Sequence, residues 1–408
     1  MNLRTKYFNN NSDVVPALAT ALMHTAFFAM IMWPLILRKD GLQSDYVHHF
    51  VVAESMLREG KVLSPHFLYQ LIILLVNWIL FHPGLIFSAF VATLLFNASF
   101  GVIAFIWTNK MINSSNKIVN WSLAALATLL TMTVTPITIF TWKTKEVYQG
   151  YLYLNSFHNP TLTCLKPLAA IVFVLVIKSF TPKIQAATPK SRLLDISILA
   201  LLTSLSIIAK PNFIICFLPA LGLFMMMRSF ILKKEVPWFF LALGVFVPSV
   251  LILYYQYQFT YGGSSSSGII FAPLLVFSLS SKWLLPKFLL SILFPLVFSM
   301  LFWKQERSEK SLQLVWLIFA FGAFYTYFLA ESGGRMEHGN FAWSGQISQS
   351  LLFMVTIALF AKQWSRFFEH NMITRLKLLL CLGIVTLHFI SGIFWGYLYY
   401  SRQVGHYL

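Results

Sequence analysis

Charged residues are scarce in this sequence. They make up 11% of the 408 residues, whereas a soluble domain carries roughly a quarter. Hydrophobic residues make up 58%. A soluble globule of this length could not bury so much apolar side chain, so lipid must be the solvent for much of the surface. The scarcity of charge therefore excludes a soluble globular protein.

Acidic residues are the scarcer kind of charge. The chain has 13 Asp and Glu against 30 Lys and Arg, which gives a net charge of +17. The basic residues are scattered between apolar runs and form no stripe with interleaved aromatic residues, so we exclude a nucleic-acid partner. An excess of Lys and Arg on cytoplasmic loops accounts for the charge.

Cysteine is also rare. Cys164, Cys216 and Cys381 lie far apart, in or beside apolar runs, and give neither a disulfide nor a zinc pattern. The short alternating strands of a β-barrel are missing as well. Because backbone polar groups in lipid must be satisfied within the segment, the apolar runs should be helices. The sequence thus predicts an all-α integral membrane protein, with residues 1–408 forming a single polytopic domain.

Apolar runs of about the length that a bilayer requires, roughly 20 residues, recur along the chain. The first of them has no small-residue cleavage site, so we interpret it as a retained span. The predicted spans are 16–36, 85–107, 118–140, 167–180, 193–209, 213–232, 238–261, 288–303, 312–330, 347–364 and 378–400.

Loop charge predicts the orientation of these eleven spans. Arg4 and Lys6 precede the first span, so the N-terminus should be cytoplasmic. The run 66–81 is short and would add one crossing too many, so we expect it to be a juxtamembrane helix on the external side, which leaves the C-terminus outside. The basic loops expected to share the cytoplasmic side are 108–117, 181–192, 233–237, 304–311 and 365–377.

The segment 37–84, between the first two spans, carries the most informative pattern. From Asp45 onward the spacing is helical, and Asp45, His48 and His49 at i, i+3 and i+4 share one face. We expect an amphipathic interfacial helix with a carboxylate at its N-terminal end. Asp45 is either a catalytic carboxylate or a helix cap that interacts favourably with the helix dipole. His48 and His49 could bind a sugar or a metal, or be ordinary interfacial residues.

This segment resembles the GT-C superfamily of membrane glycosyltransferases, which includes the protein O-mannosyltransferases, the aminoarabinose lipid A transferase and the oligosaccharyltransferases. In the family, an Asp follows the first span and starts a short interfacial helix. A Gly follows, and then a His/Pro-Leu-Tyr stretch that opens a juxtamembrane helix. The corresponding elements are Asp45 with His48 and His49, then Gly60, then residues 65–69, which read PHFLY.

The resemblance covers about residues 16–110 and implies a function. It implies an inverting glycosyltransferase of the plasma (inner) membrane, which moves a sugar from a polyprenyl-phosphate donor to a glycan, lipid or protein acceptor on the extracytoplasmic face. Asp45 would take the proton from the acceptor hydroxyl as it attacks the anomeric carbon. Many relatives have paired acids where this chain has a single Asp45, so a divalent metal is open but not indicated.

Three other external segments hold candidate substrate-binding residues. His158 and Asn159 lie in the second loop, 141–166, where His-Asn-Pro is also a natural turn before a helix. Lys210 and Asn212 lie at the corner between two spans. The lysine could hold the donor phosphate or simply extend its ammonium to the interface.

The loop 331–346 concentrates charge unusually for this chain. Its candidates are Arg335, Glu337 and His338. Arg335 is the preferred phosphate clamp, because a guanidinium binds phosphate through two hydrogen bonds. The alternative is a solvated connecting loop.

Two other functions compete with glycosyl transfer. A transporter or flippase would keep ionisable residues near mid-membrane and use broken helices. The mid-span regions have few charges, which counts against it. An O-antigen-type polymerase is also many-spanned with basic external loops, but it gives no reason for Asp45 followed by a juxtamembrane helix.

Overall fold

The structure, a computed structural model, is almost entirely α-helical in the part of the chain that it describes. This part comprises residues 11–36, 45–112, 114–139, 148–155, 157–181, 188–262, 268–279, 281–333, 336 and 339–401. One small sheet pairs β1 (Ile269–Phe271) with β2 (Leu329–Glu331) in antiparallel fashion. Apart from this sheet, the predicted all-α architecture is confirmed.

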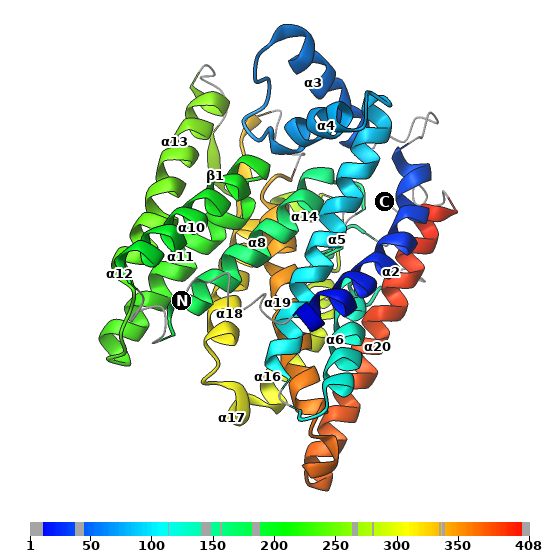
Figure 1. The fold of residues 1–408 in the computed structure, drawn as a ribbon, viewed down its shortest axis with the longest axis vertical. Coiled ribbons are helices and arrows are strands. Elements are labelled where there is room, and N and C mark those ends of the chain that lie inside the picture. The colour runs from blue at the N-terminus through cyan, green and yellow to red at the C-terminus, as the bar shows by residue number, and fades with distance from the viewer. Residues whose placement is uncertain are drawn as a thin grey trace.

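Figure 1 labels most of the helices, which are numbered in chain order. The first half contains α2 (Asn11–Ile36), α3 (Asp45–Glu59), α4 (Leu68–Ile79), α5 (Leu85–Met111), α6 (Lys117–Thr133), α8 (Pro160–Ser179) and α10 (Pro189–Ala209). The second half contains α11 (Asn212–Met226), α12 (Trp238–Leu241), α13 (Val247–Tyr261), α14 (Leu275–Ser278), α15 (Leu284–Ser291), α16 (Leu293–Leu301), α17 (Trp303–Glu306), α18 (Lys310–Phe328), α19 (Ala342–Trp364) and α20 (Met372–Tyr400). Short π-helical segments, Met227–Ile231 and Ala242–Phe246, extend α11 and join α12 to α13, and a 3₁₀ turn, Phe367–Glu369, precedes α20.

Nine helices within the described residues are long and apolar enough to cross a membrane. They are α2, α5, α8, α10, α11 with its π-helical extension, α12 continued through α13, α18, α19 and α20. The pair α15 and α16, bent by 62°, would make a tenth if it forms one span. The chain is therefore a multi-pass membrane protein.

The third predicted span, 118–140, is the one of the eleven with no counterpart among these helices, because it is only partly helical. Its helix α6 has 17 residues and ends at Thr133, seven residues early. Val134 and Thr135 are β-branched, and Pro136 disfavours helical geometry in the residue before it, which explains the early end. The number of eleven spans stays a prediction.

Two other helices, α4 and α8, bear on the predicted arrangement of the spans. The run 66–81 forms α4, which has 12 residues and is about 18 Å long, too short to span a bilayer. Helix α8 begins at Pro160 instead of residue 167, because Asn159 caps it and proline is favoured in the first turn. Lys166 consequently lies inside a membrane helix and is buried.

Helix α19 is the centre of the bundle. Every residue in its most apolar 18-residue stretch is buried inside the protein, and it packs most extensively against α18. Two of its polar side chains donate to the backbone of neighbouring segments: Gln349 to the Ser291 carbonyl at 2.6 Å and Ser350 to the Leu154 carbonyl at 2.9 Å. These contacts fix the chain segments around the bundle centre relative to α19.

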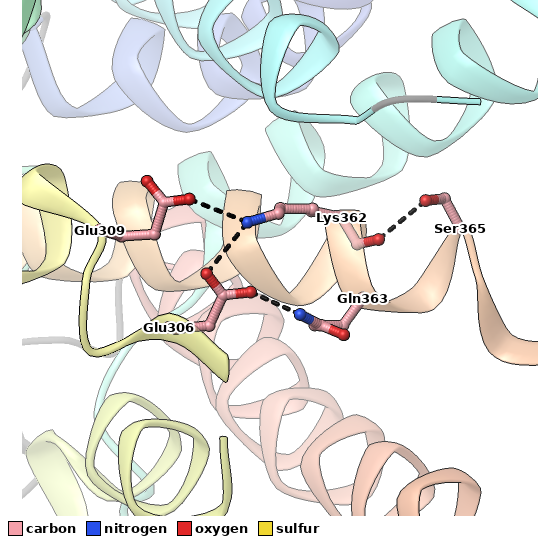
Figure 2. Close-up of polar contacts among 5 residues, drawn as sticks. All are labelled: Glu306, Glu309, Lys362, Gln363 and Ser365. Carbon is pink, nitrogen blue, oxygen red and sulfur yellow. Dashed lines mark hydrogen bonds and ion pairs between the residues drawn. The ribbon is translucent and has the colours of Figure 1, made fainter. Parts of the chain in front are cut away.

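The bundle has two polar ends. Helices α3 and α4 cover the upper end in Figure 1, here named the α3 end, and α17 lies at the opposite end, the α17 end. At the α17 end, the Lys362 ammonium donates to Glu306 at 3.1 Å and to Glu309 at 3.0 Å, and Gln363 also donates to Glu306 (Figure 2). This cluster fixes the end of α19 to the segment where α18 begins.

The predicted sidedness can be tested by cysteine labelling. The three native cysteines are buried, so background labelling should be low. We expect Lys61→Cys, at an exposed position just after α3, to react with an impermeant maleimide on intact cells. Lys304→Cys, exposed on α17, should react only after permeabilisation. The reverse pattern would show that the α3 end faces the cytoplasm.

Candidate functional site

Asp45 is the first residue of α3 and is half-buried at the α3 end of the bundle. The helix predicted from Asp45 onward is confirmed. A carboxylate in the first turn of a helix interacts favourably with the helix dipole. The Asn159 side-chain amide donates to Asp45 Oδ2 at 2.7 Å. This contact joins two segments that are 114 residues apart in the sequence.

Asn159 has two roles in this geometry. As the N-cap of α8, its Oδ1 accepts from the Leu162 backbone N–H and from the Thr161 hydroxyl, both at 2.9 Å. Its side-chain NH₂ group remains available for Asp45. The cap therefore fixes the orientation of the amide, and with it the position of the Asp45 carboxylate.

Lys210 supplies a buried cation to the same cluster. It lies between α10 and α11 and donates to Asn159 Oδ1 at 3.3 Å and to the Thr161 hydroxyl at 3.1 Å. Its ammonium is 4.5 Å from the centre of the Trp343 ring, a cation–π distance. Burial lowers the pKa of Lys210 to about 8, and the negative charge of Asp45 opposes this shift.

His158 is buried beside the cluster, among aromatic side chains. Its Nδ1 lies 2.8 Å from the Tyr399 hydroxyl, and its ring packs edge-on against Tyr148 and Trp343. Burial lowers the pKa of His158, while the charge of Asp45 acts in the opposite direction and that of Lys210 adds to the lowering. The neutral ring is therefore favoured, and a neutral imidazole can both donate and accept a hydrogen bond.

A cavity of about 590 Å³ opens beside these residues. This is the size of a small-molecule site. Tyr148, Tyr151, His158, Trp343 and Gln346 are among its wall residues. Asp45 is not among the described residues of the wall, but His158 and Trp343 connect the cavity to the cluster. We name Asp45, Asn159, Lys210 and His158 the Asp45 cluster.

Three other predicted residues, His48 and His49 of α3 and Asn212 of α11, do not belong to the Asp45 cluster. His48 is exposed. His49 is buried against α4, where its Nδ1 lies 2.9 Å from the Gln70 amide nitrogen, and burial lowers its pKa to about 3. Asn212 donates to the Asn340 carbonyl at 2.9 Å and to the Ser344 hydroxyl at 3.0 Å. His49 and Asn212 thus join structural elements to each other at this end.

Arg335, Glu337 and His338 lie outside the residues that the structure describes. The beginning of the charged loop is described: Glu331 is buried and accepts a hydrogen bond from Tyr261 at 2.6 Å and another from Asn340. These two hydrogen bonds connect Glu331 to Tyr261 at the end of α13 and to Asn340 in the same loop. The role of Arg335 as a phosphate clamp therefore stays a prediction.

The sequence pattern did not single out several residues around the cavity. Lys287 is fully buried and donates to the Gln149 carbonyl at 2.9 Å and to the Ser281 hydroxyl at 2.8 Å. Gln149 is a cavity-wall residue, so this interaction holds part of the wall in place. Trp343 and Tyr399 were also missed. The one available signal was the aromatic character of the second loop, which supplies Tyr148 and Tyr151.

Among the described residues, no group of three or more His, Cys, Asp or Glu side chains could hold a metal ion. Comparison with protein-family models, with curated proteins and with solved structures finds no match for this chain. The functional argument therefore depends on the geometry of the Asp45 cluster and its cavity.

Proposed function

We propose that the protein is an inverting membrane glycosyltransferase that uses a polyprenyl-phosphate-linked sugar. The observation that supports this best is the meeting of Asp45, Asn159 and Lys210, from three distant segments, beside a cavity with aromatic walls. A carboxylate and a cation that both hydrogen-bond to the Asn159 side chain match the two charges involved in glycosyl transfer: the proton taken from the acceptor and the negative charge of the leaving phosphate.

Asp45 is the proposed general base. In the reaction, the acceptor hydroxyl oxygen forms a bond to the anomeric carbon and its proton passes to the carboxylate. The bond between the anomeric carbon and the phosphate oxygen breaks, and the electron pair leaves with the polyprenyl phosphate. The Asn159 amide holds the carboxylate in one orientation, as an efficient base requires.

Lys210 is the proposed partner of the donor phosphate. Negative charge grows on the phosphate oxygen as the sugar leaves, and a preformed cation stabilises it. The aromatic faces of Tyr148 and Trp343, with the Tyr148 hydroxyl and the Trp343 indole N–H, suit a sugar ring, which has apolar faces and a polar edge. His158 would hydrogen-bond the sugar from the cavity wall. His48 stays a weaker candidate for the same role.

The proposal includes eleven spans, a GT-C-like arrangement and a cluster on the extracytoplasmic face of the inner membrane. The α3 end then faces outward, and the acceptor is a glycan, lipid or protein there. The test is a sugar-transfer assay on purified protein in lipid nanodiscs, with polyprenyl-phosphate sugars supplied one at a time. Absence of transfer from every donor, with labelling that places the α3 end in the cytoplasm, would refute the proposal.

A transporter or flippase is the second candidate, and two features favour it. Helices α15 and α16 are bent by 62° at one break, and broken helices are common at transport sites. Lys166 lies buried inside α8, where it donates to Asn155 at 2.7 Å. Movement of a labelled lipid-linked sugar across vesicles, without sugar transfer, would favour this function over the enzyme.

Arg335 gives a prediction that separates a clamp from a connecting loop. We expect Arg335→Ala to raise the apparent KM for the lipid-linked sugar by roughly tenfold or more, because a charge-assisted hydrogen bond to phosphate is lost. Arg335→Lys should impair activity less, since it keeps the charge but not the two-bond geometry.

A donor titration measures this effect, with Arg366→Ala, in a loop predicted to be cytoplasmic, as the control. Unchanged KM and kcat in Arg335→Ala would show that the loop is a solvated connection.

A further inference from the structure

A second cavity lies at the α17 end, on the opposite side of the bundle from the Asp45 cluster. Its volume is about 450 Å³, and it lies between α5, α8 and the start of α18. We name it the α5–α8–α18 groove. Much of its wall is aliphatic, including Val102, Ile103, Ile106, Ile171, Val174 and Leu175.

Three lysines border this groove: Lys110 at the end of α5, Lys178 at the end of α8 and Lys310 at the start of α18. Lys110 and Lys178 are close enough for their positive charges to repel each other. Lys310 donates to the Phe180 carbonyl at 2.7 Å. Bringing like charges together costs electrostatic free energy, and an anion bound between them would offset this repulsion.

Two carboxylates lie near the groove. Glu309 is the one acidic residue among the described wall residues, and its carboxylate accepts from Lys362 at 3.0 Å (Figure 2). Asp13 attracts Lys110 and accepts from the Trp121 indole at 2.9 Å. Among the described residues that line the groove, three lysines stand against one carboxylate, which Lys362 also binds, so positive charge is in excess.

The start of α18 adds a second, independent feature. The first backbone N–H groups of a helix have no intrahelical acceptors, and together with the helix dipole they favour an anion. The N-cap residue, Glu309, makes no side-chain capping bond. Ser311, in the first turn, lines the groove, is 1% exposed, and its hydroxyl has no hydrogen-bond partner within the described structure.

We propose that the α5–α8–α18 groove binds an anionic phospholipid. The headgroup phosphate would be held by the first turn of α18, the Ser311 hydroxyl and the three lysines. The acyl chains would lie on the aliphatic walls. Basic pockets between membrane helices bind anionic headgroups by this chemistry. The aliphatic wall favours a lipid over free phosphate, which would leave that surface uncovered. The site does not depend on the glycosyltransferase proposal.

Native mass spectrometry of the purified full chain, with added phosphatidylglycerol, tests this proposal. The double variant Lys110→Gln/Lys178→Gln should bind this lipid about thirtyfold more weakly, at roughly a fivefold loss per surface cation. The matched control is Lys304→Gln/Arg307→Gln, which removes the same charge from exposed positions at the same end. Its lipid affinity should equal that of the wild type.

A second variant guards against misfolding of the first. Ser311→Ala removes only a hydroxyl and should weaken phosphatidylglycerol binding by about fivefold. Phosphatidylcholine should bind the wild type more weakly than phosphatidylglycerol does. The proposal fails if Ser311→Ala and the lysine variant both bind like the wild type, or if phosphatidylcholine binds equally well. It also fails if inorganic phosphate alone displaces the lipid at comparable concentration.

Discussion

Replacing Asp45 with Asn is expected to lower the rate of sugar transfer by roughly 10²–10⁴-fold, the usual contribution of a general base. The substitution keeps the size of the side chain and its ability to cap α3. The new amide oxygen can still accept from Asn159, which lies 2.7 Å from the native carboxylate. What disappears is the charge and the basicity, so the loss should appear mainly in kcat. The measurement is donor-saturated turnover in nanodiscs, with thermal unfolding as the check on folding.

Glu54→Gln is the matched control. Glu54 lies on the same helix and is exposed, nine positions beyond Asp45, so its removal changes the charge equally without touching the cluster. Its turnover should match that of the wild type. Near-normal turnover of a well-folded Asp45→Asn variant would falsify the assignment of Asp45 as the base.

Replacing Lys210 with Gln is expected to lower kcat/KM for the lipid-linked donor by roughly 10–100-fold, the contribution of a hydrogen bond to a charged group. Gln can still donate to Asn159 and Thr161, which accept from the native ammonium at 3.3 and 3.1 Å. The variant therefore isolates the charge. The loss in Asp45→Asn should appear mainly in kcat, whereas the loss in Lys210→Gln should appear in both the donor KM and kcat, because Lys210 is proposed to bind the phosphate and to stabilise the charge that grows on it.

The pH profile gives Lys210 an independent signature. Its pKa is lowered to about 8, so the ammonium is present below this pH and is lost above it. We expect kcat/KM for the donor in the wild type to fall as pH rises through about 8, and this alkaline fall should be absent in Lys210→Gln. Lys282→Gln, at an exposed position, should keep the wild-type profile. If both variants show the same alkaline fall, the titrating group is another residue.

The sequence alone determined the solvent and the class of the fold. With 11% charged residues and long apolar runs, the chain has to satisfy its backbone in helices within lipid, and nine helices that can span a membrane are present among the described residues. Local chemistry also decided two details at the α3 end. The spacing after Asp45 produces α3, and the run after Gly60 is short enough to form α4 without crossing.

The end of α6 and the start of α8 differ from the prediction, because helix-ending and helix-capping residues act against the average hydropathy. The apolar run 118–140 looks continuous, yet α6 ends at Thr133, well before the run does, because Val134, Thr135 and Pro136 disfavour a helix. The cap provided by Asn159 extends α8 toward the N-terminus and brings Lys166 into the helix. These boundaries depend on one or two residues, whereas hydropathy averages over about twenty.

Only the tertiary structure decided which polar residues meet. Sequence reasoning assigned Asp45, Asn159 and Lys210 to three external segments, but nothing in their spacing predicts a 2.7 Å contact across 114 residues. That contact depends on how α8 packs between α5 and α10, which side-chain shape determines and hydropathy does not. The same holds for the α5–α8–α18 groove, where Lys110, Lys178 and Ser311 come together only because three helix ends converge. Charge and apolar pattern thus specified the membrane helices, while close packing among them created both candidate sites.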